Sequence, residues 1–220
     1  MARILRVGVF NNFNFSDEEF KELKQYEDEW LIFVNSNAKV KLKGPHPIVV
    51  TVNPDLTEFV KPEGDLDCIK AVRIKYVSGA NMAVRKVFRA CVSWCKMYNF
   101  PILITYMRFV NKKLLEQFTT DQSNYLWSSN YYRQQKLNKW SDPLFFYCDE
   151  KKEGCPSCKN CAKLPFGLDT DEIYSIDLEA SGDCPFDCPS CYARKIQAFR
   201  PNLRKGIIIQ NKKQTGMKHK

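Results

Sequence analysis

The sequence predicts an α/β protein whose sheet is at least partly parallel. The main observation is a strand–helix–strand pattern: residues 69–77 read as an apolar strand, residues 82–98 as a helix and residues 100–109 as a returning strand. Such a βαβ unit makes its two strands parallel, with a right-handed connection. The second observation is size, because a chain of 220 residues that is 44% hydrophobic can bury a core without disulfides.

The segments that precede this unit alternate between strand and helix signals. Ser16 followed by Glu19 forms a capping box, which begins a helix that runs to about Tyr26. Apolar runs predict strands at residues 3–10, 30–34 and 47–52, and an alternating apolar and basic run predicts an exposed edge or hairpin strand at residues 38–43.

Within the βαβ unit, a turn ends at Asn81, which caps the helix that follows. The helix has one apolar face, made by Val84, Val87, Phe88, Cys91, Trp94, Cys95 and Tyr98. Cys91 and Cys95 are therefore expected to pack in the core, as is Cys68 beside the first strand of the unit.

Later segments continue the alternation. The patterns predict helical structure at residues 112–140, first around residues 114–118 and then from about 124 to 137. They also predict a strand at 144–147, a strand at 173–178, a helix at 189–199 and a last strand at 206–210. The final ten residues are expected to be unstructured.

Cysteines divide the chain into regions. Seven of the ten fall within the 44 residues from Cys148 to Cys191, and this clustering at short spacing indicates metal binding rather than disulfides. We therefore expect an α/β region at residues 1–147, a cysteine-rich metal or cluster region at 148–199 and a basic tail at 200–220.

Charge is concentrated at the C-terminus. Residues 194–220 hold nine Lys and Arg and no acidic residue, whereas the remaining 25 basic and 25 acidic residues balance. Such a tail can bind nucleic acid, or it can be a solubilising terminus. No apolar run is long enough for a transmembrane helix and no secretory signal is present, so we expect a cytoplasmic protein without membrane contact.

The sharpest motif is the triplet Cys184, Cys188 and Cys191, spaced by three and then two residues. Three thiolates at this spacing can hold three corners of a [4Fe–4S] cluster and leave its fourth iron open. The segment DCPFDCPSCYARK resembles the signature of the radical-SAM superfamily, in particular its phage- and mobile-element-encoded members. The resemblance implies S-adenosylmethionine as a cofactor on the open iron and a 5′-deoxyadenosyl radical formed when the cluster is reduced.

The position of the motif bears on the fold. In the superfamily the cluster loop follows the first barrel strand, but only 29 residues follow Cys191 here. The resemblance therefore implies an incomplete or permuted (β/α) barrel, with the strand at residues 173–178 leading into the loop. The side chains of Asp177 and Glu179 project from the same side of that strand, where they are either polar groups of the site or solvent-exposed.

The spacing of the cysteines is also compatible with zinc binding. Cys155–Cys158 and Cys188–Cys191 are the same CPSC tetrapeptide, as in a zinc ribbon, which would make the chain a non-catalytic zinc protein with a nucleic-acid-binding tail. A second arrangement separates four thiols from the triplet, and these four could hold zinc or a second iron–sulfur cluster: Cys148, Cys155, Cys158 and Cys161. The four-plus-three division favours an enzyme, since it leaves one complete and one open site. The sequence does not indicate a substrate.

Overall fold

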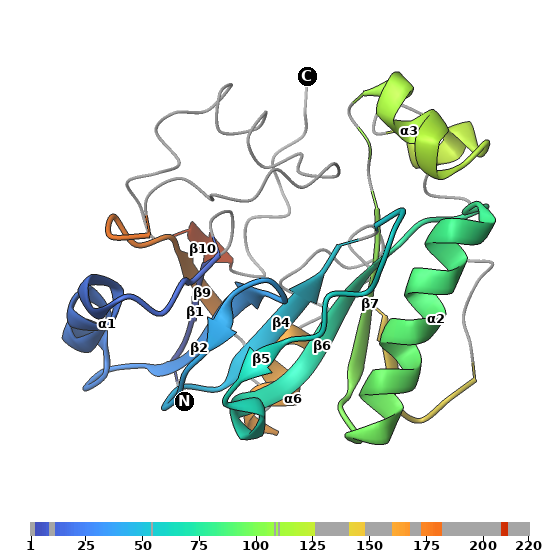
Figure 1. Ribbon diagram of the computed structural model, residues 1–220. Coiled ribbons are helices and arrows are strands. Elements are labelled where there is room, and N and C mark those ends of the chain that lie inside the picture. The colour runs from blue at the N-terminus through green and yellow to red at the C-terminus, as the bar shows by residue number, and fades with distance from the viewer. Residues whose placement is uncertain are drawn as a thin grey trace.

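The computed structural model describes residues 3–8, 12–53, 55–107, 109, 111–125, 141–147, 160–167, 173–181 and 208–210 (Figure 1). Its α-helices are α1 (Asp17–Leu23), α2 (Met82–Met97), α3 (Lys112–Phe118) and α6 (Asn160–Phe166). The strands of the main sheet are β1 (Ile4–Val7), β2 (Leu31–Asn37), β4 (Ile48–Val52), β6 (Ile69–Tyr76), β7 (Ile102–Tyr106), β8 (Phe145–Tyr147), β9 (Ile173–Ile176) and β10 (Ile208–Gln210). Strands β3 (Lys41–Leu42) and β5 (Glu63–Gly64) form a separate small sheet.

The main sheet has the strand order β10-β9-β1-β2-β4-β6-β7-β8. All neighbours from β9 to β8 are parallel, and β10 alone is antiparallel, beside β9. The order from β1 to β8 follows the chain, but β9, the last parallel strand, pairs with β1 at the opposite edge from β8. The sheet curls into a half-barrel, which confirms the expected incomplete or permuted (β/α) barrel.

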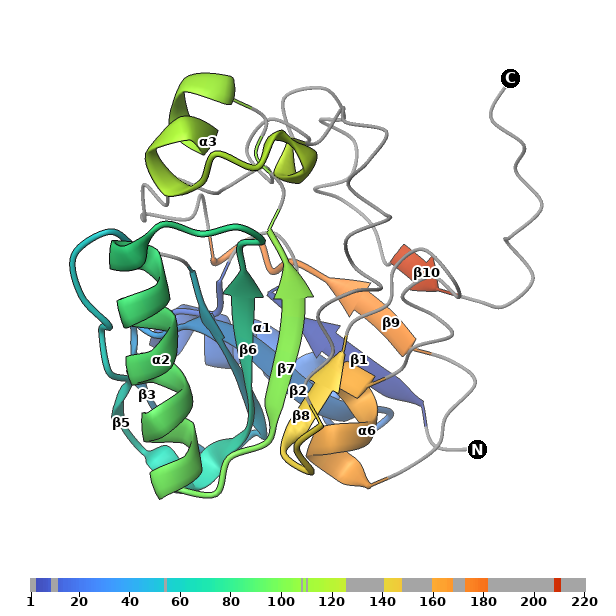
Figure 2. The same cartoon turned by 90° about the vertical axis from the view of Figure 1, so that its right-hand side faces the viewer.

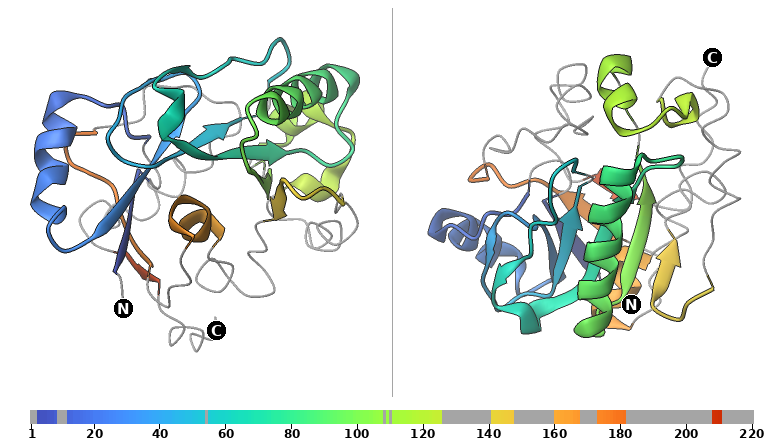
Figure 3. Two further views of the ribbon diagram at one scale, coloured as in Figure 1. Left: turned by 90° about the horizontal axis from the view of Figure 1, so that it is seen from below. Right: turned by 45° about the vertical axis from the view of Figure 1, so that its right-hand side comes forward.

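The two faces of the curled sheet are covered differently. Helices α1 and α2 lie on its convex side, whereas α6 lies within the curve, as the view from below shows (Figure 3, left). The convex face belongs to the largest apolar cluster, which includes Val50, Val72 and Cys91. A second cluster lies on the concave face near the amino ends of the strands, and Leu164 and Phe166 of α6 pack against it. Helix α6 therefore fills the lower part of the half-barrel.

Local signals explain the helices near the strands. Ser16 accepts a hydrogen bond from the Glu19 backbone N–H (3.2 Å) and the Glu19 carboxylate accepts one from the Ser16 N–H (3.0 Å), so the predicted capping box is confirmed. Asn81 caps α2 by accepting from the Val84 N–H (3.1 Å). The βαβ unit is confirmed as β6, α2 and β7, with β6 and β7 parallel.

Several predicted boundaries are wrong. The strand expected at residues 30–34 extends as β2 to Asn37, because polar residues continue the pairing with β4. The segment at 38–43 contains only the two-residue β3, because a turn separates it from β2. Helix α3 ends at Phe118, where the first of the two predicted helices was expected to end, and a short 3₁₀ turn at Gln122–Asn124 follows it. The expected helices at residues 124–137 and 189–199 lie outside the described residues, apart from positions 124 and 125.

The last two strands come from the C-terminal part of the chain. Strand β9 pairs with β1 in register from Ile4 opposite Ile173 to Val7 opposite Ile176, and β10 pairs with β9. Both strands therefore belong to the same sheet as the strands formed by residues 1–147. Among the described helices, none is long and apolar enough to cross a membrane.

Candidate functional site

The concave face changes character along the strands. Near their amino ends it is apolar, through Ile4, Phe33, Val49, Ala71 and Leu103, which pack with α6. Because side chains alternate along a strand, the next residues on this face are two positions further on. These residues, on the carboxyl side of the apolar layer, are mainly polar: Arg6, Asn35, Asn37, Thr51, Arg73, Lys75, Thr105 and Ser175.

Three of these polar side chains are buried without a hydrogen-bond partner in the part of the chain that the structure describes. They are Asn35 on β2, Thr105 on β7 and Ser175 on β9. Asn35 is only 2% exposed, and neither its amide nitrogen nor its amide oxygen is paired. A buried polar group with no partner costs about 1–3 kcal/mol, so several on one face mark a place where water or a ligand completes the bonding.

Among the described residues, the charged side chains on this face are mostly basic. Arg6 on β1 is buried and lies opposite Ser175 of β9, and Arg73 and Lys75 on β6 are half-buried. Asp177, which directly follows β9, continues the side of the strand that Ser175 occupies, because Ile176 and Leu178 both pack in the convex core. Of the two sequence-predicted carboxylates, Asp177 therefore lies on the concave side and is half-buried, whereas Glu179 is exposed.

Helix α1 holds the turn that follows β9. The backbone N–H groups of Glu179 and Ala180 donate to the two carboxylate oxygens of Glu22 (3.0 and 2.9 Å). The Ser181 hydroxyl donates to the buried carboxylate of Glu19 (2.5 Å). The N-terminal part of the chain thus fixes the segment that leads to Cys184, in the turn beside α1 in Figure 1.

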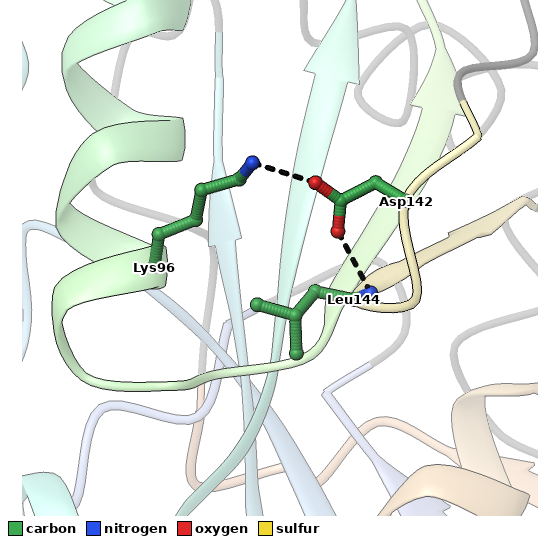
Figure 4. A network of polar contacts seen from close by, with 3 residues as sticks. All are labelled: Lys96, Asp142 and Leu144. Carbon is green, nitrogen blue, oxygen red and sulfur yellow. Dashed lines mark hydrogen bonds and ion pairs between the residues drawn. The ribbon is translucent and has the colours of Figure 1, made fainter.

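The opposite edge of the half-barrel is fixed by an ion pair. Lys96, in the last turn of α2, donates to Asp142 (2.6 Å), and the Leu144 backbone N–H donates to the same carboxylate (3.0 Å), just before β8 (Figure 4). The Lys96 ammonium and the Leu144 N–H hold the pKa of Asp142 below its usual range. Figure 2 shows β8 beside β7, with α6 nearby.

The cysteine side chains of the predicted metal sites lie outside the described residues. These are Cys184, Cys188 and Cys191 of the triplet and Cys148, Cys155, Cys158 and Cys161 of the second group. The backbone of Cys161 is described and lies in the first turn of α6. Among the described residues no cluster of three or more His, Cys, Asp or Glu side chains could hold a metal ion.

The other three cysteines are free thiols. Cys91 and Cys95 are fully buried in the convex core, as predicted from the helical period. A hydrogen bond with Cys95, together with burial, raises the pKa of the Cys91 thiol. Cys68 is half-buried against the same core and donates to Asp65 (3.2 Å).

Sequence reasoning missed the polar residues of the concave face. Asn35, Thr105 and Ser175 stand among apolar neighbours in strands, and one polar residue in an apolar run carries little information by itself. A signal was present in β2, where Asn35, Ser36 and Asn37 directly follow an apolar run. Their burial became apparent only when the strands were paired.

The fold is a parallel half-barrel whose concave face carries unpartnered buried polar side chains toward the carboxyl ends of its strands, among the residues that the structure describes, which makes this face a candidate ligand site. Comparison of the chain with protein-family models, with curated proteins and with solved structures finds no match.

Proposed function

We propose that this chain is an iron–sulfur enzyme of radical-SAM type, in which Cys184, Cys188 and Cys191 hold a [4Fe–4S] cluster. The observation that carries the proposal is the place of β9 in the sheet. The strand that leads to the triplet pairs with β1 and begins the parallel series, and the other strands follow in chain order. A strand in this place corresponds to the first strand of a barrel whose chain has been permuted.

The connection between β9 and the triplet is short. Ser181 and Cys184 are three positions apart in the sequence, so an extended chain spans at most about 11 Å between their α-carbons. Ser181 is held by Glu19, and the turn before it is held by Glu22. The described segment that leads to the triplet therefore leaves the sheet at the carboxyl end of β9, the end at which barrel enzymes carry out their chemistry.

The donor set suits the proposed group. Three thiolates leave one iron of a [4Fe–4S] cluster for an external ligand, and the resemblance of the segment to radical-SAM proteins identifies that ligand as S-adenosylmethionine. When bound and reduced, the pair would supply a 5′-deoxyadenosyl radical. The chain would supply the concave face, where buried Asn35, Thr105 and Ser175 are available to position a ligand near the cluster.

The second group of thiols belongs to the same proposal as a separate metal site, which holds zinc or a second cluster through Cys148, Cys155, Cys158 and Cys161. Support comes from α6, because Cys161 lies in its first turn and Leu164 and Phe166 of the same helix pack into the concave core. A metal bound there would stabilise the helix that fills the lower half-barrel.

Partners and compartment complete the proposal. The basic residues at 194–220 would attract a nucleic acid by counterion release. A cytoplasmic, reducing compartment fits the proposal, because the thiols that hold a cluster must stay reduced.

Anaerobic reconstitution with iron and sulfide tests the cluster. The wild-type chain should turn brown and retain iron, Cys188→Ala should lose the triplet's iron, and Cys68→Ala should retain it as a thiol-matched control. With S-adenosylmethionine and a strong reductant, the wild type should release 5′-deoxyadenosine. A colourless chain that holds stoichiometric zinc and no iron would instead make it the zinc-binding, nucleic-acid-associated protein.

A further inference from the structure

Two basic side chains of one strand project on the concave side of the sheet. Arg73 and Lys75 alternate in β6 with Val72 and Ile74, which pack in the convex core, so both residues lie on the side of Ala71, above α6. Both are half-buried, which makes their charge more effective than on an open surface. The strand thus presents two positive charges to the concave face.

The neighbouring strands add neutral polar groups beside these cations. Thr105 of β7 is the partner of Lys75 in the sheet, and Thr51 of β4 is the partner of Arg73. Neither β4 nor β7 contains an acidic residue. Asp177 follows β9, four strand spacings from β6, or about 19 Å along the sheet. Arg73 and Lys75 are thus the charged side chains that β4, β6 and β7 contribute to this face.

A buried amide points to a ligand at the same face. Asn35 of β2 lies two strands from β6 and is 2% exposed, and its amide donor and acceptor have no partner among the described residues. The Thr105 hydroxyl is also buried and has no hydrogen-bond partner within the described part of the chain. Native proteins satisfy nearly all buried polar groups, so these atoms indicate a polar molecule on the concave face.

We propose that the concave face binds a substrate that carries an oxyanion, a carboxylate or a phosphate, next to Arg73 and Lys75. Asn35 and Thr105 hydrogen-bond to the polar part of the same molecule. The inference rests on the proposed function, because it assigns this face to the substrate of that enzyme. The chemistry that selects the substrate is the charge of β6 together with a nearby amide that both donates and accepts.

Equilibrium dialysis of the purified full chain with labelled inorganic phosphate, and separately with labelled acetate, tests the inference at constant ionic strength. We expect saturable binding of one anion per chain, and the preferred anion shows whether a phosphate or a carboxylate is recognised. Arg73→Gln should weaken this binding at least about tenfold, since a charge-assisted hydrogen bond is lost. Lys70→Gln is the matched control, because Lys70 lies on the same strand but is exposed.

Thr105→Val provides a second variant of nearly unchanged shape, which should weaken binding without loss of charge. The inference is overturned if neither anion binds, or if Arg73→Gln and Thr105→Val bind as the wild type does. S-adenosylmethionine has a carboxylate of its own, so dialysis is repeated in its presence. Retained anion binding supports a separate substrate oxyanion, whereas displacement assigns the cations to that carboxylate and overturns the inference.

Iron content measured on the same samples separates the two proposals. A chain that retains iron but binds neither anion contradicts the substrate inference alone. A chain that binds the anion through Arg73 but holds zinc and no iron contradicts the proposed function and leaves the anion site supported.

Discussion

Glu19 connects the beginning of the chain to the segment that leads to the cysteine triplet. Its side chain is fully buried, and its carboxylate accepts from the backbone N–H groups of Asn14 (2.9 Å) and Ser16 (3.0 Å) and from the Ser181 hydroxyl (2.5 Å). Replacing Glu19 by Ala removes the acceptor for all three donors. We therefore expect Glu19→Ala to lower the free energy of unfolding substantially.

The magnitude follows from the three bonds. A hydrogen bond whose partner is left in a buried or half-buried place costs about 1 kcal/mol, so the loss of three should cost about 3 kcal/mol. Ser181→Ala removes one of the three without orphaning a backbone group and should cost about 1 kcal/mol. Glu18→Ala is the control, since Glu18 is exposed in the same helical turn and has the same change in helix propensity.

Urea unfolding followed by circular dichroism measures the three variants under one set of conditions. The reasoning is refuted if Glu19→Ala and Glu18→Ala unfold at the same urea concentration. It is also refuted in its second part if Glu19→Ala is strongly destabilised but Ser181→Ala equals the wild type, because the turn after β9 would then not depend on this carboxylate.

Three further predictions concern other parts of the chain. Cys158→Ser should lower the melting temperature while the triplet keeps its iron, and loss of all metal in metal analysis would show that the two cysteine groups share one site. Deletion of residues 211–220 removes four lysines and should lower RNA or DNA affinity, with a salt dependence reduced by about 0.7–0.9 log units per lost phosphate contact; equal binding of both chains in a filter assay would reduce the tail to a solvated terminus. Burial lowers the pKa of His46 below its ordinary value of 6.5, against the opposing effect of Glu27, so the native state binds fewer protons than the unfolded chain and stability should fall as the pH drops below 6.5. His46→Gln should show a smaller fall in melting temperature over this pH range, and an equal fall would contradict the assignment.

Local features were predictable from the sequence because the atoms that create them are close in the chain. The capping box joins Ser16 and Glu19, three residues apart, and the cap of α2 joins Asn81 and Val84. The apolar face of α2 follows from its period, and Cys91, Trp94 and Cys95 are buried as that period requires. The sequence likewise indicated a parallel pair around α2, since a βαβ unit is itself a local pattern.

The placing of the site depended on contacts between distant residues. The sequence showed a strand before Cys184, but only the pairing of Ile173–Ile176 with Ile4–Val7 places that strand beside β1. The same holds for the concave face, whose polar residues lie up to 169 positions apart in the sequence and share a face only because their strands pair in one sheet. Composition and periodicity thus determined the fold class and its local elements, because these depend on short-range order. Tertiary structure decided strand order, the bond between Glu19 and Ser181, and the burial of Asn35, because each depends on hydrogen bonds and packing between segments that the chain order does not bring together.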